Sequence, residues 1–154
     1  MNPPESIRVL RENQNMKKRA HAGKTAGAVG QFVTAINRHD AGALTALMTN
    51  DHLFVDSLGH RVQGAAAMEA GWRGYFRMCP DYWIRTDDAI AEGDLVLAAG
   101  EAGGTIDGVA WRTPAAWKAV VREGRIAEWR VFADNKPVYQ ILARREQDSV
   151  RDPR

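Results

Sequence analysis

The chain has 154 residues, of which 45% are hydrophobic and 26% are charged, as is typical of one globular domain and not of a disordered or collagen-like chain. Its formal net charge is +2, from 21 Lys and Arg against 19 Asp and Glu. Proteins that follow nucleic-acid phosphates carry a much larger basic excess. We therefore expect a single folded domain without a nucleic-acid partner.

The single cysteine, Cys79, excludes an intrachain disulfide and a cysteine-rich zinc site. Its place between Met78 and Pro80 predicts a buried thiol at a helix end. No stretch approaches the roughly 18 apolar residues of a membrane span, and residues 1–18 lack the apolar run of a signal peptide. The expected setting is reducing and cytoplasmic, with no membrane partner.

Two polar ends flank the predicted domain. Residues 1–24 are rich in Arg, Lys and Asn and contain one short apolar cluster, at residues 7–10, which predicts a solvated lead-in helix or a frayed tail. Residues 145–154 have no apolar face and predict a disordered tail. The domain itself is expected over residues 25–144.

The first half of this domain begins with helical spacing. Apolar residues three and four apart between residues 29 and 36 predict a helix, and Asp40 is placed to cap a second, short one. A strand, a turn and a third helix, which Pro80 stops, are then expected at residues 51–56, 57–60 and 64–78.

Long strands are predicted from residue 82 onward. Glu92-Gly93-Asp94 and Arg122-Glu123-Gly124 read as hairpin turns, and Pro114 predicts an edge or a bulge because it cannot donate to a central ladder. The strands are expected at residues 82–91, 95–105, 109–121 and 125–133, with a closing helix at residues 136–144.

This order of elements predicts an α+β domain. A long antiparallel meander twists and curls, so the helices are expected to pack on the concave face of a strongly bent sheet and to form a cone-shaped fold with an apolar interior. The convex face of the strands at residues 95–133 carries apolar side chains that need a cover. We therefore expect a homodimer.

Several segments resemble the nuclear transport factor two-like superfamily, and within it the SnoaL-like polyketide cyclases and the ketosteroid isomerases. The matching segments are FVTAINRHDAGALTALMTNDHLFVDSLG, the helix at residues 64–76, the pair Gly104-Thr105, and GRIAEWRVFADNKPV. The resemblance spans residues 26–143 and implies a cystatin-like α+β barrel. It leaves the activity open, because this superfamily includes isomerases, dehydratases, cyclases, hydrolases and plain binders.

The resemblance assigns roles to two aspartates. Asp56 falls where the ketosteroid isomerases carry their general base, and Asp134, eight residues after Ile126, falls where the polyketide cyclases carry their acid/base aspartate. The oxyanion tyrosine of the isomerases aligns with Phe32, and their protonated carboxyl falls near residues 116–117, Ala-Trp. The missing donors argue against steroid isomerisation.

Two further activities of the superfamily find no counterpart. Limonene epoxide hydrolases need Arg-x-Asp and a second Asp where this chain has Gly100, Ala102 and Val131. Scytalone dehydratase relies on a pair of histidines in the sheet, and no histidine follows His60.

Each aspartate also has a structural interpretation. Strand alternation places His52, Phe54 and Asp56 on one face, so we expect Asp56 to face the apolar interior with a raised pKa, as a general base would. The alternative is that Asp56 caps the turn at residues 57–59. Asp134 is equally well placed to cap the closing helix.

Aromatic residues supply the remaining candidates for a ligand site. Five tryptophans mark core or interface packing, with two or three of them lining a pocket. Glu101 is expected to face outward, and the small residues 98–104 to leave room for a ligand or for neighbouring rings. The four histidines lack metal-ligand spacing, so no metal and no cofactor are expected. The predicted substrate contacts are Phe32, Phe54, Trp72, Phe76, Tyr82, Trp117 and Phe132.

These features favour a small cofactor-independent enzyme of isomerase or lyase type. It would move protons on an apolar, carbonyl-bearing metabolite in a hydrophobic pocket, by isomerisation, cyclisation or dehydration. Asp56 is the predicted base, with Asp134, Tyr82 or an indole N–H hydrogen-bonding the oxyanion. The alternative is a non-catalytic small-molecule-binding or dimeric interaction domain of the same fold.

Overall fold

Six strands form one curved, unclosed sheet in the computed structural model, which describes residues 4–151. The order across the sheet is β2-β1-β6-β5-β4-β3, and neighbours run antiparallel except β1 and β6, which are parallel. β2 and β3 therefore form its two edges. The strands are β1 (Met48–Val55), β2 (Arg61–Gln63), β3 (Trp83–Glu92), β4 (Leu95–Ile106), β5 (Val109–Arg122) and β6 (Arg125–Ala133).

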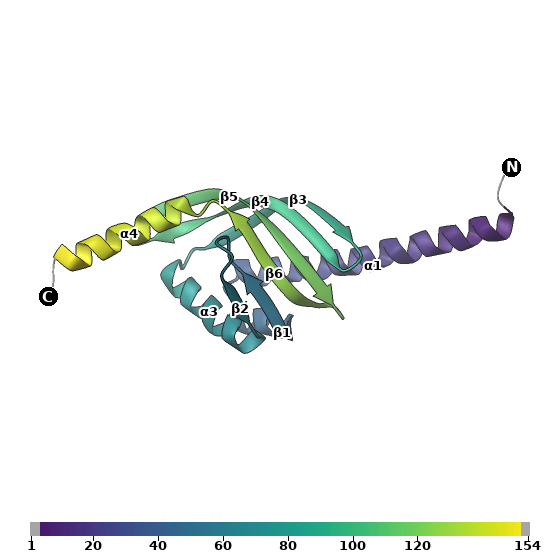
Figure 1. The fold of residues 1–154 in the computed structure, drawn as a ribbon, viewed down its shortest axis with the longest axis horizontal. Helices are drawn as coiled ribbons and strands as arrows, with labels where there is room; N and C mark the ends of the chain where they lie inside the picture. The colour runs from purple at the N-terminus through teal and green to yellow at the C-terminus, as the bar shows by residue number, and fades with distance from the viewer. Residues whose placement is uncertain (1–3, 152–154) are drawn as a thin grey trace.

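Four helices accompany the sheet. Figure 1 shows the strands arching over α3 and the inner part of α1, while α1 and α4 project at opposite ends of the molecule. This arrangement confirms the predicted α+β cone with helices on the concave side of a bent sheet. The helices are α1 (Glu5–Asn37), α2 (Ala41–Ala46), α3 (Ala65–Met78) and α4 (Lys136–Arg151).

α1 has two halves with different environments. Residues 4–21 are all exposed, and the first buried residue is Thr25, whose hydroxyl donates to the carbonyl of Gly93 at 3.1 Å. Phe32 and Ile36 follow in the buried half, and both are fully buried. The predicted lead-in helix is thus a solvated continuation of a core helix, and only its inner half can stabilise the domain by burial.

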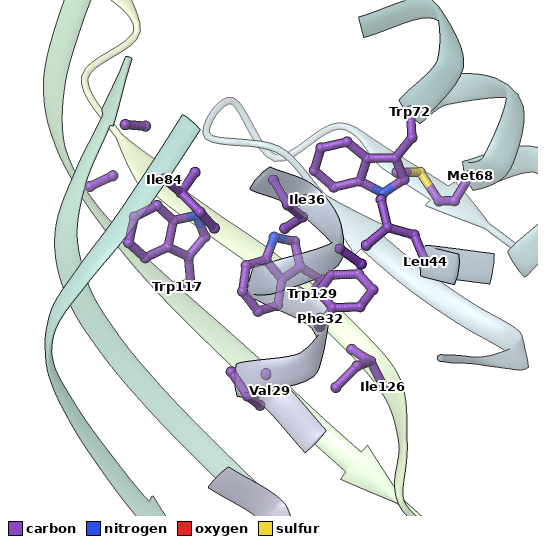
Figure 2. Packing of buried hydrophobic residues seen from close by; sticks show 14 of the residues in the cluster. Val29, Phe32, Ile36, Leu44, Met68, Trp72, Ile84, Trp117, Ile126 and Trp129 are labelled. Carbon is purple, nitrogen blue, oxygen red and sulfur yellow. The ribbon is translucent and has the colours of Figure 1, made fainter. Parts of the chain in front are cut away.

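The core joins α1 to the centre of the sheet. Phe32 packs on Trp129 with ring centroids 4.9 Å apart, and Trp129 stacks against Trp117 at 6.4 Å. Figure 2 shows these rings beside one another, with Trp72 and Met68 entering from α3. Burying a large apolar side chain contributes about 1.5–3 kcal/mol, so this layer anchors α1 and α3 to the strands.

Local signals account for most element boundaries. Asp40 caps α2 as predicted, accepting a hydrogen bond from the Ala43 amide at 2.9 Å. Pro114 lies at a local edge, because β6 pairing ends where Ala133 meets Ala115 and Pro114 pairs only with Glu101 of β4. β2 escaped prediction because three residues with one apolar side chain carry no periodicity.

The C-terminal segment corrects one expectation. Residues 145–154 were predicted to be disordered, but α4 continues as a helix to Arg151, and residues 152–154 lie outside the described part. Arg, Glu and Gln favour helix even where no apolar face exists, and Arg145 pairs with Asp107 at 3.2 Å. Low hydrophobicity therefore indicated exposure here, not loss of helix.

None of the helices described between residues 4 and 151 is both long and apolar enough to cross a membrane.

The sheet face opposite the helices carries an exposed apolar patch. Ile90 pairs with Leu97, and Ala116 pairs with Phe132, which places these residues on one face. Ile90, Leu97 and Phe132 are 74%, 48% and 51% exposed. Three charged side chains lie beside them: Glu128 contacts Lys118 at 2.8 Å and Arg130 at 3.5 Å, so one acidic group offsets one of the two basic charges.

We propose that a second copy of the chain covers this patch. The exposed apolar side chains form most of this patch and only one uncompensated basic charge lies beside them, so little repulsion opposes a two-fold symmetric contact with an identical face. Sedimentation at micromolar concentration should give a dimer, and Leu97→Asp should shift it to monomer. Val150→Asp, on the exposed end of α4, should leave the dimer intact. A monomeric wild-type protein would contradict the proposal.

Candidate functional site

An apolar cavity of about 320 Å³ lies between α3, α4 and the concave face of the sheet. Its walls come from seven elements, namely β1, β2, α3, β4, β5, β6 and α4, and from the connecting segments that follow β1 and precede β3 and α4. The lining residues are Phe54, Asp56, Ser57, Val62, Met68, Gly71, Trp72, Tyr75, Met78, Tyr82, Ala102, Trp111, Ala115, Trp117, Trp129, Val131, Ala133, Asn135, Val138, Tyr139 and Leu142.

Regular spacing directs these side chains inward. On α3, Trp72 and Tyr75 lie three residues apart and share a face. On β5, Trp111, Ala115 and Trp117 occupy alternate positions and therefore point to the same side of the strand. The cavity is thus built from rigid elements, which hold its shape before any ligand binds.

α4 covers one side of the cavity. Val138, Tyr139 and Leu142 reach into the lining from its first two turns. The residue before this helix, Asn135, donates from Nδ2 to the Ser57 hydroxyl at 2.9 Å. This bond ties the start of α4 to the turn that carries Asp56.

Aromatic rings dominate the lining. Tyr82 stacks against Trp111 with centroids 6.1 Å apart and meets Tyr75 edge-on at 4.8 Å. Trp72 lies 6.4 Å from Tyr82 and 6.3 Å from Phe54. Rings in such offset and edge-on contacts form a stable apolar wall that presents both faces and edges to a ligand.

Two tyrosine hydroxyls supply neutral polar groups in this wall. Burial raises the pKa of Tyr75 and of Tyr82 well above the usual tyrosine range, so both stay protonated at neutral pH. Neither hydroxyl forms a hydrogen bond with another residue in the described chain, 4–151. Both are therefore available as donors to a ligand.

Asp56 closes the turn after β1. Its Oδ1 accepts from the amides of Leu58 at 2.9 Å and His60 at 2.8 Å, and its Oδ2 accepts from His60 Nδ1 at 2.9 Å. The Asp56 amide donates in turn to the His60 carbonyl at 3.0 Å. The capping interpretation of Asp56 is therefore confirmed, although its side chain also lines the cavity.

The prediction of a raised pKa for Asp56 is wrong. Burial does raise the pKa of this carboxyl, but the amide and ring of His60 and the amide of Leu58 together lower it further, to below its ordinary value. The side chain is still 32% exposed, so desolvation is incomplete. Asp56 is consequently a carboxylate at neutral pH.

Asp134 does not line the cavity, although its chain neighbours Ala133 and Asn135 do. Its Oδ1 accepts from the Lys136 amide at 3.0 Å at the start of α4, which confirms the capping interpretation. The side chain is exposed, in a shallow surface groove shared with Lys136. The expected acid/base role is corrected accordingly, because an exposed cap cannot reach a ligand held inside the cavity.

Three of the seven predicted contacts are misplaced. Phe32 lies fully buried behind Trp129, and Phe76 stacks on the outer side of Trp72 at 5.4 Å. Phe132 points to the convex face, since its neighbours in β6 line the cavity and alternation turns it away. The four that do line the cavity are Phe54, Trp72, Tyr82 and Trp117.

The small residues of β4 make room mainly for protein groups. A Cβ at Gly103 would lie 2.7 Å from the Trp83 ring, and one at Gly104 would overlap the sulfur of Cys79. Only Ala102 of this stretch lines the cavity. Glu101 faces outward as predicted, paired with Arg85 at 2.9 Å and with Arg112.

Two further buried groups have structural roles. Cys79 is fully buried at the end of α3, as predicted, and burial raises the pKa of its thiol. His52 is also fully buried and donates from Nδ1 to the Ile126 carbonyl at 2.7 Å, while burial lowers the pKa of its ring. Within residues 4–151, no three side chains of metal-ligating type are grouped.

The turn at Asp56 leads to a stability prediction. Asp56→Ala should lower the free energy of unfolding by about 1 kcal/mol at pH 7, as loss of a cap does, whereas Asp56→Asn keeps an oxygen for the two amides and should cost only a few tenths. Because the folded pKa lies below the ordinary 3.8, the ionised carboxylate stabilises the fold above that pH and this contribution is lost as the pH falls through the folded pKa. Urea unfolding from pH 3 to pH 7 tests both points. Equal stability of wild type and Asp56→Ala at pH 7 would contradict them.

Solved structures of the same fold are numerous. A SnoaL-like polyketide cyclase, so named, from Jannaschia sp. CCS1 is 18% identical, with a TM-score of 0.71, over 77% of this chain and 91% of that one. An M. tuberculosis epoxide hydrolase of the LEH-like type is 20% identical, with a TM-score of 0.68, over 79% and 84%. A protein of ketosteroid isomerase-like fold from Catenulispora acidiphila, in complex with trimethylamine, is 21% identical, with a TM-score of 0.64, over 68% and 83%.

These identities show the shared fold and leave ligand and reaction open. Among curated proteins, no sequence matches this chain. The family model for the SnoaL-like domain matches residues 29–129, which is more than half of the chain. The resemblance to the nuclear transport factor two-like superfamily is thereby confirmed, and the chain belongs to the SnoaL-like domain family.

Proposed function

We propose that this protein binds a small, largely apolar molecule in the cavity between α3, α4 and the sheet. The observation that carries the proposal is an aromatic-lined space of about 320 Å³. Protein cores are normally packed without such voids, and ligand sites typically have about 300–1,000 Å³ and mostly apolar walls with a few polar groups. Asp56, Ser57, Asn135 and the tyrosine hydroxyls supply those polar groups.

The neighbours in fold support a small-molecule site. Their names refer to a polyketide cyclase, to an epoxide hydrolase and to a complex with trimethylamine. All three concern small molecules and not macromolecular partners. At 18–21% identity they support the kind of site and not the identity of its ligand.

Filling the cavity should weaken ligand binding strongly. Ala115 is 7% exposed and lines the cavity, so Ala115→Leu places three more carbons in that space. The uncharged fluorophore N-phenyl-1-naphthylamine should show saturable emission with wild type and at least tenfold weaker binding to this variant. Ala20→Leu, on the exposed outer half of α1, is the matched control and should bind as wild type. Equal binding to both variants would place the probe elsewhere and contradict the proposal.

Acid–base catalysis is the second candidate function. One observation favours it: an ionised Asp56 and the protonated hydroxyls of Tyr75 and Tyr82 line the same cavity. Asp56 would take a proton from the carbon beside a carbonyl, and a tyrosine hydroxyl would hydrogen-bond the developing oxyanion. A catalytic aspartate can work with a pKa close to the ordinary value. Isomerisation, aldol-type cyclisation and dehydration all begin with this step.

Hydrogen exchange tests this candidate directly. In D₂O, the protein should speed the incorporation of deuterium beside the carbonyl of 2-tetralone, an apolar bicyclic ketone, as followed by NMR. A placed acid or base contributes typically 10²–10⁴-fold, so Asp56→Asn should bring exchange close to the rate in buffer. Asp40→Asn removes a carboxylate that caps a helix elsewhere and should keep the activity. If wild type exchanges no faster than buffer, this candidate is excluded for that ketone class.

A further inference from the structure

The charge of the cavity has one sign. Among its lining residues in the described chain, Asp56 is the single acidic or basic side chain. His60 contacts Asp56 from a position 75% exposed to solvent and does not line the cavity. A ligand therefore meets a carboxylate and no basic group.

The walls around this carboxylate favour the same kind of ligand. Phe54 lies two residues before Asp56 and lines the cavity with it, and the ring of Trp72 is 6.3 Å from that of Phe54. The faces of aromatic rings carry partial negative charge and attract cations within about 6 Å of the ring centre. Deeper in the cavity, Tyr82 and Trp111 extend the same aromatic surface.

Three ligand classes can be compared at such a site. An anion would meet the charge of Asp56 with no basic side chain in the lining to offset it. A neutral apolar ligand would partly remove the water around a carboxylate that is 32% exposed, without replacing it. A cation with apolar substituents gains from both the carboxylate and the ring faces.

We propose that the ligand of this cavity is an organic cation, an ammonium compound with methyl, alkyl or aryl substituents, whose charged nitrogen lies between Asp56 and the neighbouring aromatic rings. The apolar substituents fill the deeper, tryptophan-lined part. This inference rests on the proposed binding function and specifies the ligand class of the same site. In this role Asp56 pairs with a positive charge and does not take a proton from carbon.

The test compares two molecules of equal shape. In 4-hydroxyphenyltrimethylammonium and 4-tert-butylphenol, a positively charged nitrogen and a neutral carbon carry the same three methyl groups. Calorimetric titration of the full chain at pH 7 and low salt should show the cation binding at least tenfold more tightly. Raising NaCl from 20 mM to 500 mM should weaken binding of the cation and leave binding of the neutral molecule unchanged.

Variants assign the preference to Asp56. Asp56→Asn should reduce the preference for the cation to a few-fold. It should not weaken the binding of 4-tert-butylphenol, because the asparagine oxygen can still accept the hydrogen bonds from the two amides of the turn. Asp134→Asn removes a carboxylate that caps α4 outside the cavity and should retain the full preference.

The outcomes separate the two proposals. Equal binding of both molecules, or tighter binding of the neutral one, would overturn the inference while leaving cavity binding intact. The inference would also be overturned if neither molecule binds while N-phenyl-1-naphthylamine still binds wild type and binds Ala115→Leu more weakly. If the wild-type protein binds neither of these molecules nor N-phenyl-1-naphthylamine, the proposed function itself is contradicted. A salt-insensitive preference that persists in Asp56→Asn would show that the carboxylate does not select the ligand.

Discussion

The bent sheet presents more concave surface than one helix can cover. The buried half of α1 fills one part, where Phe32 and Ile36 pack against Trp129. The other part is covered by α3, which contacts β1 and β2, and by α4, which contacts β5, and a cavity of about 320 Å³ remains between these helices and the sheet. Close packing is favoured wherever side chains can interdigitate, so the remaining space reflects this geometry: its walls are the aromatic rings of both layers.

Sequence periodicity predicted the layers because it reflects burial directly. The stripe of α1 correctly predicted a helix with one apolar face, and the alternation of β1 correctly placed Phe54 beside Asp56, but the stripe did not show that Phe32 lies in the core and not in the cavity wall. Periodicity could not predict the ionisation of Asp56, because strand alternation gives the direction of a side chain and not its hydrogen-bond donors. Those donors belong to Leu58 and His60, and they converge only when the turn adopts its folded conformation.

Other site residues depend on long-range placement that spacing does not encode. Tyr139 lines the cavity because the first two turns of α4 cover one side of it. Val138, Ile141 and Leu142 have helical spacing and predict an apolar face, but spacing does not tell which surface that face covers. Phe132 was misassigned for a simpler reason: its β6 neighbours Val131 and Ala133 line the cavity, so alternation turns it outward, as the parity of the strand would have indicated. Asp134 precedes α4 as expected, but its side chain caps that helix at the surface and does not enter the cavity.

Asp56 joins the stability of the turn to the chemistry of the cavity. The hydrogen bonds that lower its pKa keep it charged across the neutral range, and the same bonds make it a weaker base. A group that must accept a proton from carbon benefits from a pKa near the working pH, whereas a group that must hold a cation benefits from remaining ionised. With three donors on Asp56 and no basic side chain among the described lining residues, the site is better suited to holding positive charge than to generating a carbanion.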